Sequence, residues 1–453
     1  MDKKQNNINR RQFLDIGVKS TALSLASPLV GLGDQGANRK RRLALVGTGS
    51  RGSIFWGKFL LQHYGQRHVD LVGLCDINVK RARFARQYIG ADIPVFHANE
   101  FDRMITGTQP DAIIIATTDC FHEKYAVRAM QLGCDVICEK PLATEAEQCR
   151  SLLQTEKKTG KKIITTFNAR FGNVAEEIKR IIMSGELGRI ISAEYHEYLD
   201  IIHGASYYRR WNGRIKYSGS LLVHKASHHF DQMNWWLNAE PETVHAFGDL
   251  SFYGKNNSFR YRKCRGCPFQ QKCDFYWDIT KDKMAVQMYV NCEDEDGYIR
   301  DSCVWDNEID AYDAMTVQVR YYNGTLLNYS LNAFMPYEGQ RIAFNGEKGR
   351  LDVRLYSRQP WQPENKNEFR LTKNFGRTKT WSVQIGKGGH GGADNGLQDM
   401  LFLPNQSDPL GKMADSRDGV MASLTGIAAR KSIETGDTVR IDDLVDFPLR
   451  WRW

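Results

Sequence analysis

Between residues 42 and 168 the chain alternates short apolar runs with longer amphipathic segments. Short apolar runs bounded by turn residues are typical of buried strands, and the segments between them have the length and periodicity of helices. Strands are expected at residues 43–46, 69–75, 112–116, 135–138 and 163–167, and helices at 79–89, 121–133 and 145–159. This alternation predicts an α/β domain with a doubly wound parallel sheet.

After about residue 170, longer strand-like segments rich in Tyr, Val and Thr replace this alternation. Asn-Gly favours the positive φ angles of a type I′ hairpin turn, and Asn323-Gly324 and Asn345-Gly346 are two such signals. Other elements are expected as a helix at 174–184, strands at 190–198, 315–322 and 325–330, and a last helix at about 419–435. The pattern after residue 170 therefore predicts a second domain of the α+β class, with a large, mostly antiparallel open sheet.

The composition is that of an ordinary globular protein. The chain has 453 residues, of which 42% are hydrophobic and 25% are charged. The formal net charge is +9, but residues 1–42 hold nine Lys/Arg against three Asp/Glu and therefore contribute +6. The remaining charge of about +3 gives no reason to expect a nucleic-acid partner.

The N-terminus contains a candidate export signal. Residues 9–14, with Arg10-Arg11 at their centre, resemble the twin-arginine motif, and a modestly apolar stretch follows from Ile16 to Leu32. This stretch is too short and too polar for a membrane span, so no stable membrane insertion is expected. Residues 1–38 are interpreted as an export signal and linker, which predicts a periplasmic or otherwise exported protein. A basic N-terminus without signal function is the alternative.

A glycine-rich motif follows the first expected strand. The sequence G-x-G-x-x-G places glycines where a tight turn brings backbone N–H groups close to a pyrophosphate at a helix N-terminus. The residues predicted to bind a dinucleotide here are Gly47, Gly49, Ser50, Arg51 and Gly52. Asp76 ends the second strand, where a carboxylate accepts hydrogen bonds from the ribose and repels a 2′-phosphate. NAD is therefore preferred over NADP, in a Rossmann domain covering residues 39–168.

Several further segments resemble one enzyme family. Glu139-Lys140-Pro141 follows a strand, and related segments occur at residues 116–122, 167–170, 346–351 and 431–436. Together with the glycine motif they resemble the Gfo/Idh/MocA oxidoreductases, named for glucose-fructose oxidoreductase and inositol dehydrogenase. The resemblance runs from about residue 42 to 445 and implies a substrate and oligomerisation domain at residues 169–453. It also implies cofactor contacts from Thr117, His122, Glu139, Lys140 and Asn168.

The resemblance also implies a catalytic group. Lys140 would lie beside the nicotinamide and polarise the reacting oxygen or relay its proton. Relatives carry a D-x-x-x-H pattern, in which His228 matches the family histidine and His224 replaces the aspartate. Lys225 lies between them, and three basic groups on one helical face would depress its pKa or bind substrate hydroxyls. A metal pair formed by His224 and His228, or ordinary buried histidines, are the alternatives.

The substrate pocket is predicted from scattered residues. His390 lies among glycines in residues 388–392, which suggests a loop that approaches a ligand closely, and a plain flexible loop is the alternative. Similar segments occur in the NAD-dependent glycosidase branch of the same superfamily. Burial in a core explains the aromatic candidates about equally well. The predicted substrate-binding residues are Arg170, Tyr195, His196, Trp211, His229 and His390.

A cysteine cluster lies in an expected insertion at about residues 255–305. Cys264, Cys267 and Cys273 have C-x2-C-x5-C spacing, and Cys292 or Cys303 could be a fourth partner. Four thiolates suit zinc or an iron–sulfur cluster, whereas export favours disulfides, and free thiols are the third interpretation. None of these makes the cluster catalytic.

The leading hypothesis is an NAD-dependent oxidoreductase that transfers hydride to or from a secondary hydroxyl of a sugar, glycoside or polyol. Exported NAD cannot be recycled by diffusion to cytoplasmic enzymes, so tightly bound cofactor is expected. One alternative is an NAD-dependent glycoside hydrolase that acts by transient oxidation and elimination. The other is a non-catalytic sugar-binding protein on the same fold. The resemblance also implies a homo-oligomer formed through the C-terminal sheet.

Overall fold

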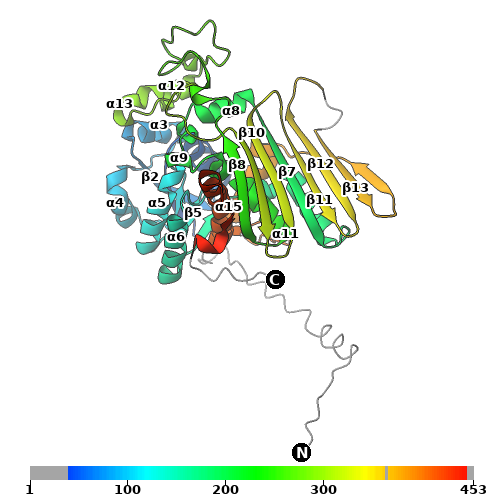
Figure 1. Ribbon diagram of the computed structural model, residues 1–453. Coiled ribbons are helices and arrows are strands. Elements are labelled where there is room, and N and C mark those ends of the chain that lie inside the picture. The colour runs from blue at the N-terminus through cyan, green and yellow to red at the C-terminus, as the bar shows by residue number, and fades with distance from the viewer. Residues whose placement is uncertain (1–38, 363–365, 446–453) are drawn as a thin grey trace, which may run out of the picture. The chain divides into compact units, whose positions relative to one another are not determined.

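The computed structural model describes residues 39–362 and 366–445. Within these ranges the chain forms two β-sheets (Figure 1). The twin-arginine motif and the apolar stretch after it lie outside the described residues. None of the helices in the described ranges has the length and apolar character needed to cross a membrane.

The first sheet has the strand order β15-β6-β5-β4-β1-β2-β3. Its strands are β1 (Arg41–Val46), β2 (Val69–Asp76), β3 (Val95–His97), β4 (Ala112–Ile115), β5 (Asp135–Cys138), β6 (Ile163–Thr165) and β15 (Ala414–Asp415). The first six are parallel, and β15 pairs antiparallel with β6. The order of β1 to β6 is that of a dinucleotide-binding domain, which confirms the predicted Rossmann sheet.

Helices separate these strands along the chain. They are η1 (Arg51–Phe59), which is π-helical, α2 (Leu60–Tyr64), α3 (Val79–Ile89), α4 (Phe101–Thr108), α5 (His122–Gln131) and α6 (Ala146–Thr159). Strands β1 and β4 are buried on both faces between them, as expected for continuous apolar runs. Local signals set the ends of α3, because Asn78 accepts a hydrogen bond from the Arg81 N–H and Gly90 takes a left-handed conformation.

The second sheet has nine strands in the order β14-β13-β12-β11-β7-β10-β9-β8-β16. They are β7 (Ile190–Asp200), β8 (Pro241–Asp249), β9 (Ala314–Tyr321), β10 (Leu326–Met335), β11 (Glu338–Gly346), β12 (Gly349–Arg358), β13 (Asn367–Lys373), β14 (Thr378–Trp381) and β16 (Val439–Arg440). Only the pairing of β7 with β10 is parallel among these described strands. The prediction of a mostly antiparallel sheet is confirmed.

The remaining α-helices follow β6 along the chain. They are α7 (Asn173–Met183), α8 (Ile201–Tyr208), α9 (Ile215–Ser218), α10 (Leu221–His224), α11 (Ser227–Leu237), α12 (Lys283–Met288), α13 (Glu293–Asp296), α14 (Ala393–Phe402) and α15 (Ser416–Thr435). Helix α15 packs against α6 of the first domain and against β8, α10 and α11 of the second. It therefore joins the two sheets through one continuous hydrophobic core.

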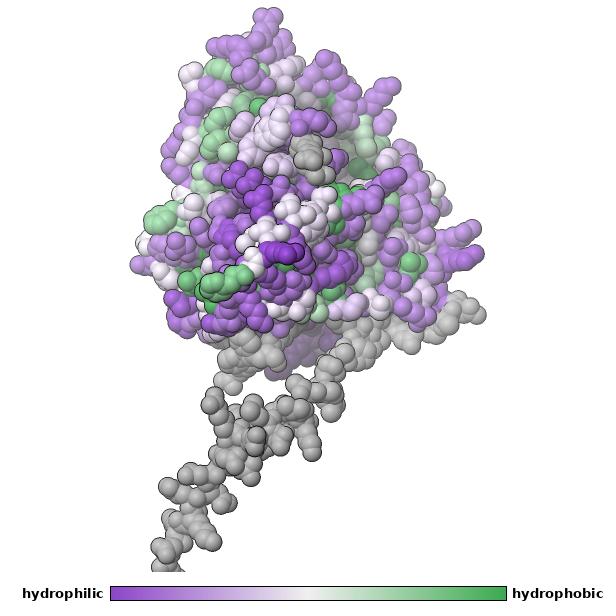
Figure 2. Space-filling view, turned by 90° about the vertical axis from the view of Figure 1, so that its right-hand side faces the viewer, coloured by the Kyte–Doolittle hydropathy of each residue, from purple (hydrophilic) through white to green (hydrophobic). Residues whose placement is uncertain are grey.

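Only one face of the second sheet packs against the hydrophobic core. Residues of β9 alternate between buried and exposed, so the other face carries polar side chains. Figure 2 shows the side of the molecule nearest β13, which is mainly hydrophilic with small, separate hydrophobic areas.

The two expected turns differ from prediction in detail. The hairpin of β9 and β10 is present, but Gly324 alone has positive φ at the Asn323-Gly324 pair, and Asn323 instead accepts a hydrogen bond from the Thr325 N–H. The turn is therefore not of type I′, which needs positive φ at both residues. Asn345 and Gly346 are the last two residues of strand β11, and the turn to β12 lies at Glu347-Lys348.

Candidate active site

The glycine-rich turn links β1 to η1 and leaves no room for side chains at two of its glycines. Gly47 has φ +91°, and a Cβ there would lie 2.5 Å from the Ala116 carbonyl oxygen. A Cβ on Gly52 would lie 1.9 Å from the Gly47 carbonyl oxygen. The helix therefore starts directly on the turn, with its N-terminal N–H groups at the loop. This backbone fits the pyrophosphate of a dinucleotide.

Asp76 organises this turn. Its carboxylate accepts hydrogen bonds from the Thr48 N–H at 2.7 Å, the Thr48 hydroxyl at 2.8 Å and the Asn78 N–H at 2.9 Å. Arg81 Nη1 lies 3.4 Å from the same carboxylate. Asp76 was expected to bind a ribose, yet its oxygens are buried and engaged by protein donors. The carboxylate thus fixes the loop and places negative charge at the end of β2.

Glu139 contacts the glycine-rich loop and directly precedes Lys140 in the chain. Arg51 Nε donates to its carboxylate at 2.6 Å, and the Trp56 indole N–H donates at 2.8 Å. Burial alone would raise the pKa of Glu139, but the charge and hydrogen bond of Arg51 outweigh it and lower the pKa. Glu139 is therefore a charged residue that orients Arg51.

Asp394 brings the glycine-rich loop around His390 to the same place. It pairs with Arg51 Nη2 at 3.1 Å and accepts hydrogen bonds from Asn168 Nδ2 at 2.7 Å and from His390 Nδ1 at 2.8 Å. The His390 side chain is 66% exposed. The structure thus joins Arg51, Asn168 and His390, which are distant in sequence, through the carboxylate of Asp394.

Lys140 lies just after β5, at the carboxyl edge of the parallel sheet. Its ammonium donates to the His224 carbonyl oxygen at 2.8 Å. Burial lowers the pKa of Lys140 to about 8, against the opposing charges of Asp119 and Glu139. The Lys140 ammonium is therefore poised to exchange a proton near neutral pH.

His224 has a carboxylate partner from a different element. Its Nδ1 lies 2.5 Å from Asp119 Oδ2, in the loop after β4. Burial raises the pKa of Asp119 and lowers the pKa of His224. A carboxylate thus lies against position 224 although position 224 itself is a histidine. The sequence segment around Asp119 had been used for the resemblance without a role for this residue.

His228 keeps an unused hydrogen-bonding atom. In the described ranges its Nδ1 is buried and has no hydrogen-bond partner, while its ring packs edge-on against Phe167. Burial lowers the pKa of His228 well below its usual value, and the charges of Lys140 and Lys225 lower it further. His228 is therefore a neutral imidazole that can accept a proton.

Lys225 is not the depressed lysine that the sequence predicted. Helix α10 ends at His224 and α11 begins at Ser227, so the three basic residues do not share one helical face. Lys225 Nζ pairs with Glu197 Oε1 at 3.1 Å. Burial would lower its pKa, but the Glu197 charge raises it above the usual value. Lys225 is a fixed positive charge.

Family comparisons agree with this geometry. Residues 41–167 match the NAD-binding Rossmann fold of the oxidoreductase family, and residues 179–441 match its C-terminal alpha/beta domain. The chain belongs to the Gfo/Idh/MocA oxidoreductases.

Individual relatives differ in coverage. The chain is 33% identical over 426 residues to YteT of Bacillus subtilis, covering 89% of this chain and 98% of YteT, whose name assigns it only to the oxidoreductases. It is 26% identical over 226 residues to inositol 2-dehydrogenase of Salmonella paratyphi B, covering 50% of this chain and 58% of that enzyme. The WlbA dehydrogenase of Bordetella pertussis, solved with NADH and UDP-GlcNAcA, shares the fold with a TM-score of 0.59 and 20% identity, covering 89% and 99% of the two chains.

Within the Gfo/Idh/MocA fold, the predicted substrate residues separate into two groups. Trp211 borders the site, because its ring lies edge-on to the His224 ring at 5.4 Å, and Tyr207, from the same aromatic run, lies edge-on to that ring as well. His390 reaches the site through Asp394. The structure thus brings Trp211 and His390 toward the catalytic groups.

The other four predicted substrate residues have structural contacts instead. Arg170 is buried in an ion pair with Asp231, and the buried Tyr195 hydroxyl donates to Gln232. His229 is buried against the Tyr329 hydroxyl. His196 bonds Ser330 on the opposite face of β7, since neighbouring strand residues point to opposite faces. These contacts do not support the predicted substrate roles of Arg170, Tyr195, His196 and His229.

His122 lies between the loop after β4 and the loop after β5. His122 is buried, with Nδ1 2.7 Å from the Pro141 carbonyl oxygen and Nε2 3.2 Å from the Thr117 carbonyl oxygen. Burial lowers the pKa of His122, and a neutral imidazole has a single N–H, so it donates to one of these two carbonyl oxygens. His122 therefore lies between the loop of Lys140 and the loop after β4.

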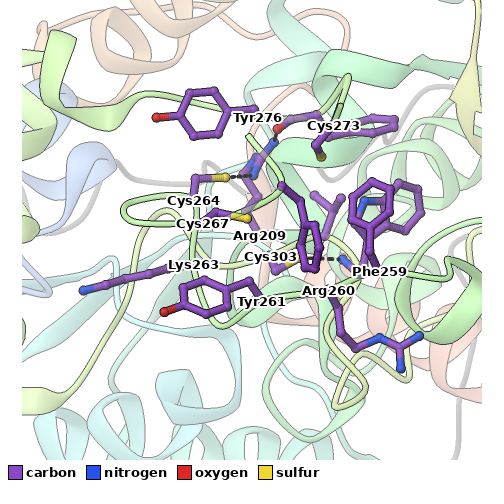
Figure 3. A pocket seen from close by; sticks show the side chains of 14 residues that line it. Arg209, Phe259, Arg260, Tyr261, Lys263, Cys264, Cys267, Cys273, Tyr276 and Cys303 are labelled. Atoms are coloured by element: carbon purple, nitrogen blue, oxygen red, sulfur yellow. Dashed lines mark hydrogen bonds between the residues drawn. The ribbon is translucent and has the colours of Figure 1, made fainter. Parts of the chain in front are cut away.

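The cysteine cluster lines a pocket in the insertion (Figure 3). All ten cysteines lie in the described ranges, and none forms a disulfide. The described residues also contain no group of three or more His, Cys, Asp or Glu placed to hold a metal ion. The zinc, iron–sulfur and disulfide interpretations are therefore not supported, nor is a metal site built on His224 and His228. Arg209 Nη1 instead donates to Cys264 Sγ at 3.1 Å, as the dashed line in Figure 3 shows.

Proposed function

We propose that this protein is an NAD-dependent oxidoreductase that transfers hydride to or from a secondary hydroxyl of a sugar, glycoside or polyol. The observation that carries the proposal is that Lys140 contacts the His224–Asp119 pair, close enough to His228 and to Arg51 of the glycine-rich turn for their charges to interact. The dehydrogenase names of relatives are consistent with it. NAD is proposed over NADP because Asp76 places negative charge where a 2′-phosphate would lie.

A nicotinamide ring bound at this site would accept or supply the hydride. The protein groups handle the proton. The neutral imidazole of His228 accepts the proton of the substrate hydroxyl, and the Lys140 ammonium stabilises the negative charge that develops on the oxygen. His224 positions Lys140 through its carbonyl oxygen, while Asp119 holds the His224 ring. The Trp211 and Tyr207 rings offer apolar faces to a sugar.

The product decides between this proposal and its alternatives. Purified protein would be incubated with a panel of glycosides and polyols, and the products analysed by mass spectrometry. A product two hydrogens lighter with its glycosidic bond intact is expected. Free aglycone with unoxidised sugar would instead indicate the NAD-dependent glycoside hydrolase, an alternative favoured by the exposed His390 beside Arg51. Sugar binding without any chemistry would indicate a non-catalytic binding protein.

The proposed roles predict a bell-shaped pH dependence of kcat/KM for alcohol oxidation. Activity should rise with pH through the lowered pKa of His228, because the imidazole must be neutral to accept a proton. It should fall as pH rises through about 8, where Lys140 loses its charge. Lys140→Arg should move the basic limb to higher pH, since arginine keeps its charge. A basic limb unchanged in that variant would contradict the assignment to Lys140.

Export and assembly complete the proposal. We propose export through the twin-arginine signal, which carries folded proteins and would allow the cofactor to be captured first. Fractionation of cells that produce the full chain tests this.

We also propose a homo-oligomer formed through the exposed face of the second sheet, supported by its row of partly polar, uncovered strands. Light scattering that shows a monomer at micromolar concentration would contradict it.

A further inference from the structure

The insertion between β8 and β9 docks onto the glycine-rich turn. We call residues 283–298 the strap, which includes α12 and α13 and lies beside α3 (Figure 1). The Tyr289 hydroxyl accepts a hydrogen bond from the Ser50 N–H at 3.0 Å and lies 2.8 Å from the Ser50 hydroxyl. Gly49 faces the same hydroxyl, since a Cβ there would lie 3.6 Å from it. The strap thus reaches the loop expected to hold the pyrophosphate.

A second set of contacts fixes the strap at the end of β2. Arg81 Nη2 pairs with Asp296 at 2.7 Å, and its Nη1 lies near Asp76. Lys80 pairs with Asp294, and the buried Asn78 amide donates to the Cys292 carbonyl oxygen at 2.8 Å. These residues lie where the ribose of the adenosine half binds in a Rossmann domain. The strap therefore spans from the pyrophosphate end to the ribose end of the predicted cofactor site.

We infer that the strap retains the dinucleotide and selects NAD against NADP, with Tyr289 and Asp296 as the residues responsible. This inference rests on the proposed function. The Tyr289 hydroxyl occupies the Ser50 N–H, a donor of the kind that binds a phosphate oxygen. The Tyr289 hydroxyl must therefore yield that donor when the cofactor enters, and the displaced hydroxyl then donates to the same phosphate. The strap closes in this way over the bound dinucleotide and must open again before the cofactor can leave.

Selection follows from the charges around Arg81. An arginine beside the ribose commonly accommodates the 2′-phosphate of NADP. Here Arg81 is paired on both sides with the carboxylates of Asp76 and Asp296. Two carboxylates around one guanidinium leave a net negative charge, which repels a phosphate. Asp296 would thus act on cofactor choice although it lies far from Asp76 in the sequence.

Cofactor retention tests the role of Tyr289. Full-length protein and Tyr289→Phe would be dialysed exhaustively, and the NAD released on denaturation would be quantified by mass spectrometry. Exchange of bound NAD for isotope-labelled NAD would give the dissociation rate. Wild type should retain NAD, and Tyr289→Phe should lose it at least about tenfold faster, because a phosphate-site hydrogen bond worth about 1.4 kcal/mol is removed. Tyr276→Phe, in the cysteine pocket of the same insertion, is the matched control and should behave as wild type.

The outcomes separate this inference from the proposed function. If wild type and Tyr289→Phe retain NAD and exchange it at equal rates, the strap does not retain the cofactor. If Asp296→Asn leaves the ratio of NADP to NAD dissociation constants unchanged, instead of shifting it about tenfold toward NADP, the selection role is wrong. If wild type neither contains nor binds any nicotinamide dinucleotide, the proposed function itself fails.

Discussion

Replacing Lys140 with methionine should lower kcat for the preferred substrate by about 10²- to 10³-fold, the range for losing one group that stabilises a developing oxyanion. Methionine has a similar length, and it removes the only charge that we assign to the reacting oxygen. The fold should tolerate the change, because the His224 carbonyl oxygen keeps a second donor in the Ser227 hydroxyl at 3.2 Å. The measurement is steady-state kinetics on protein with known cofactor content, so that lost chemistry is distinguished from lost NAD.

Lys179 offers a matched control for this prediction. It is also a buried lysine whose pKa burial lowers to about 8, and its ammonium donates to a carbonyl oxygen, that of Trp235. It lies on α7, outside the candidate active site. Lys179→Met should therefore keep its kcat per folded molecule, even if stability falls. A kcat of Lys140→Met within about threefold of wild type would show that Lys140 is not the charged partner of the substrate oxygen.

Local signals predicted the elements of the cofactor site well. Helix α3 begins and ends where expected, because Asn78 caps its start and Gly90 ends it within the same short segment. Strand β5 also has the expected bounds, since its apolar run is closed on both sides by polar residues. The glycine spacing predicted a turn whose two close approaches leave no room for a side chain. These features depend on neighbours in sequence.

The contacts that define the catalytic groups depend on distant segments. The partner of His224 is Asp119, from another strand's loop, and no local pattern joins them. Glu197, which lies on strand β7, raises the pKa of Lys225, whereas the sequence predicted a lowered pKa. On the same strand a register difference of one residue decides that His196 faces away from the core. The strap comes from an insertion with no regular pattern, so its contact with Ser50 could not be predicted.

Replacing Arg170 with methionine should destabilise the protein by about 3–5 kcal/mol, the cost of leaving one member of a buried ion pair alone. Arg170 is 2% exposed, and its guanidinium donates to Asp231 through Nε at 2.8 Å as part of a two-point contact. Asp231 is also fully buried, so water cannot replace the lost partner. The measurement is the free energy of unfolding from urea denaturation of the wild type and the variant.

The pH dependence of that loss identifies its cause. Burial raises the pKa of Asp231 even with Arg170 beside it, and without Arg170 the pKa should rise further. The folded variant then binds more protons than the unfolded chain, so its stability falls as pH rises, and the loss should be larger at pH 8 than at pH 5. Arg180→Met, which breaks an exposed pair with Glu176, should cost no more than about 1 kcal/mol at either pH. If Arg170→Met instead keeps wild-type stability but raises KM, Arg170 contacts the substrate as the sequence first suggested.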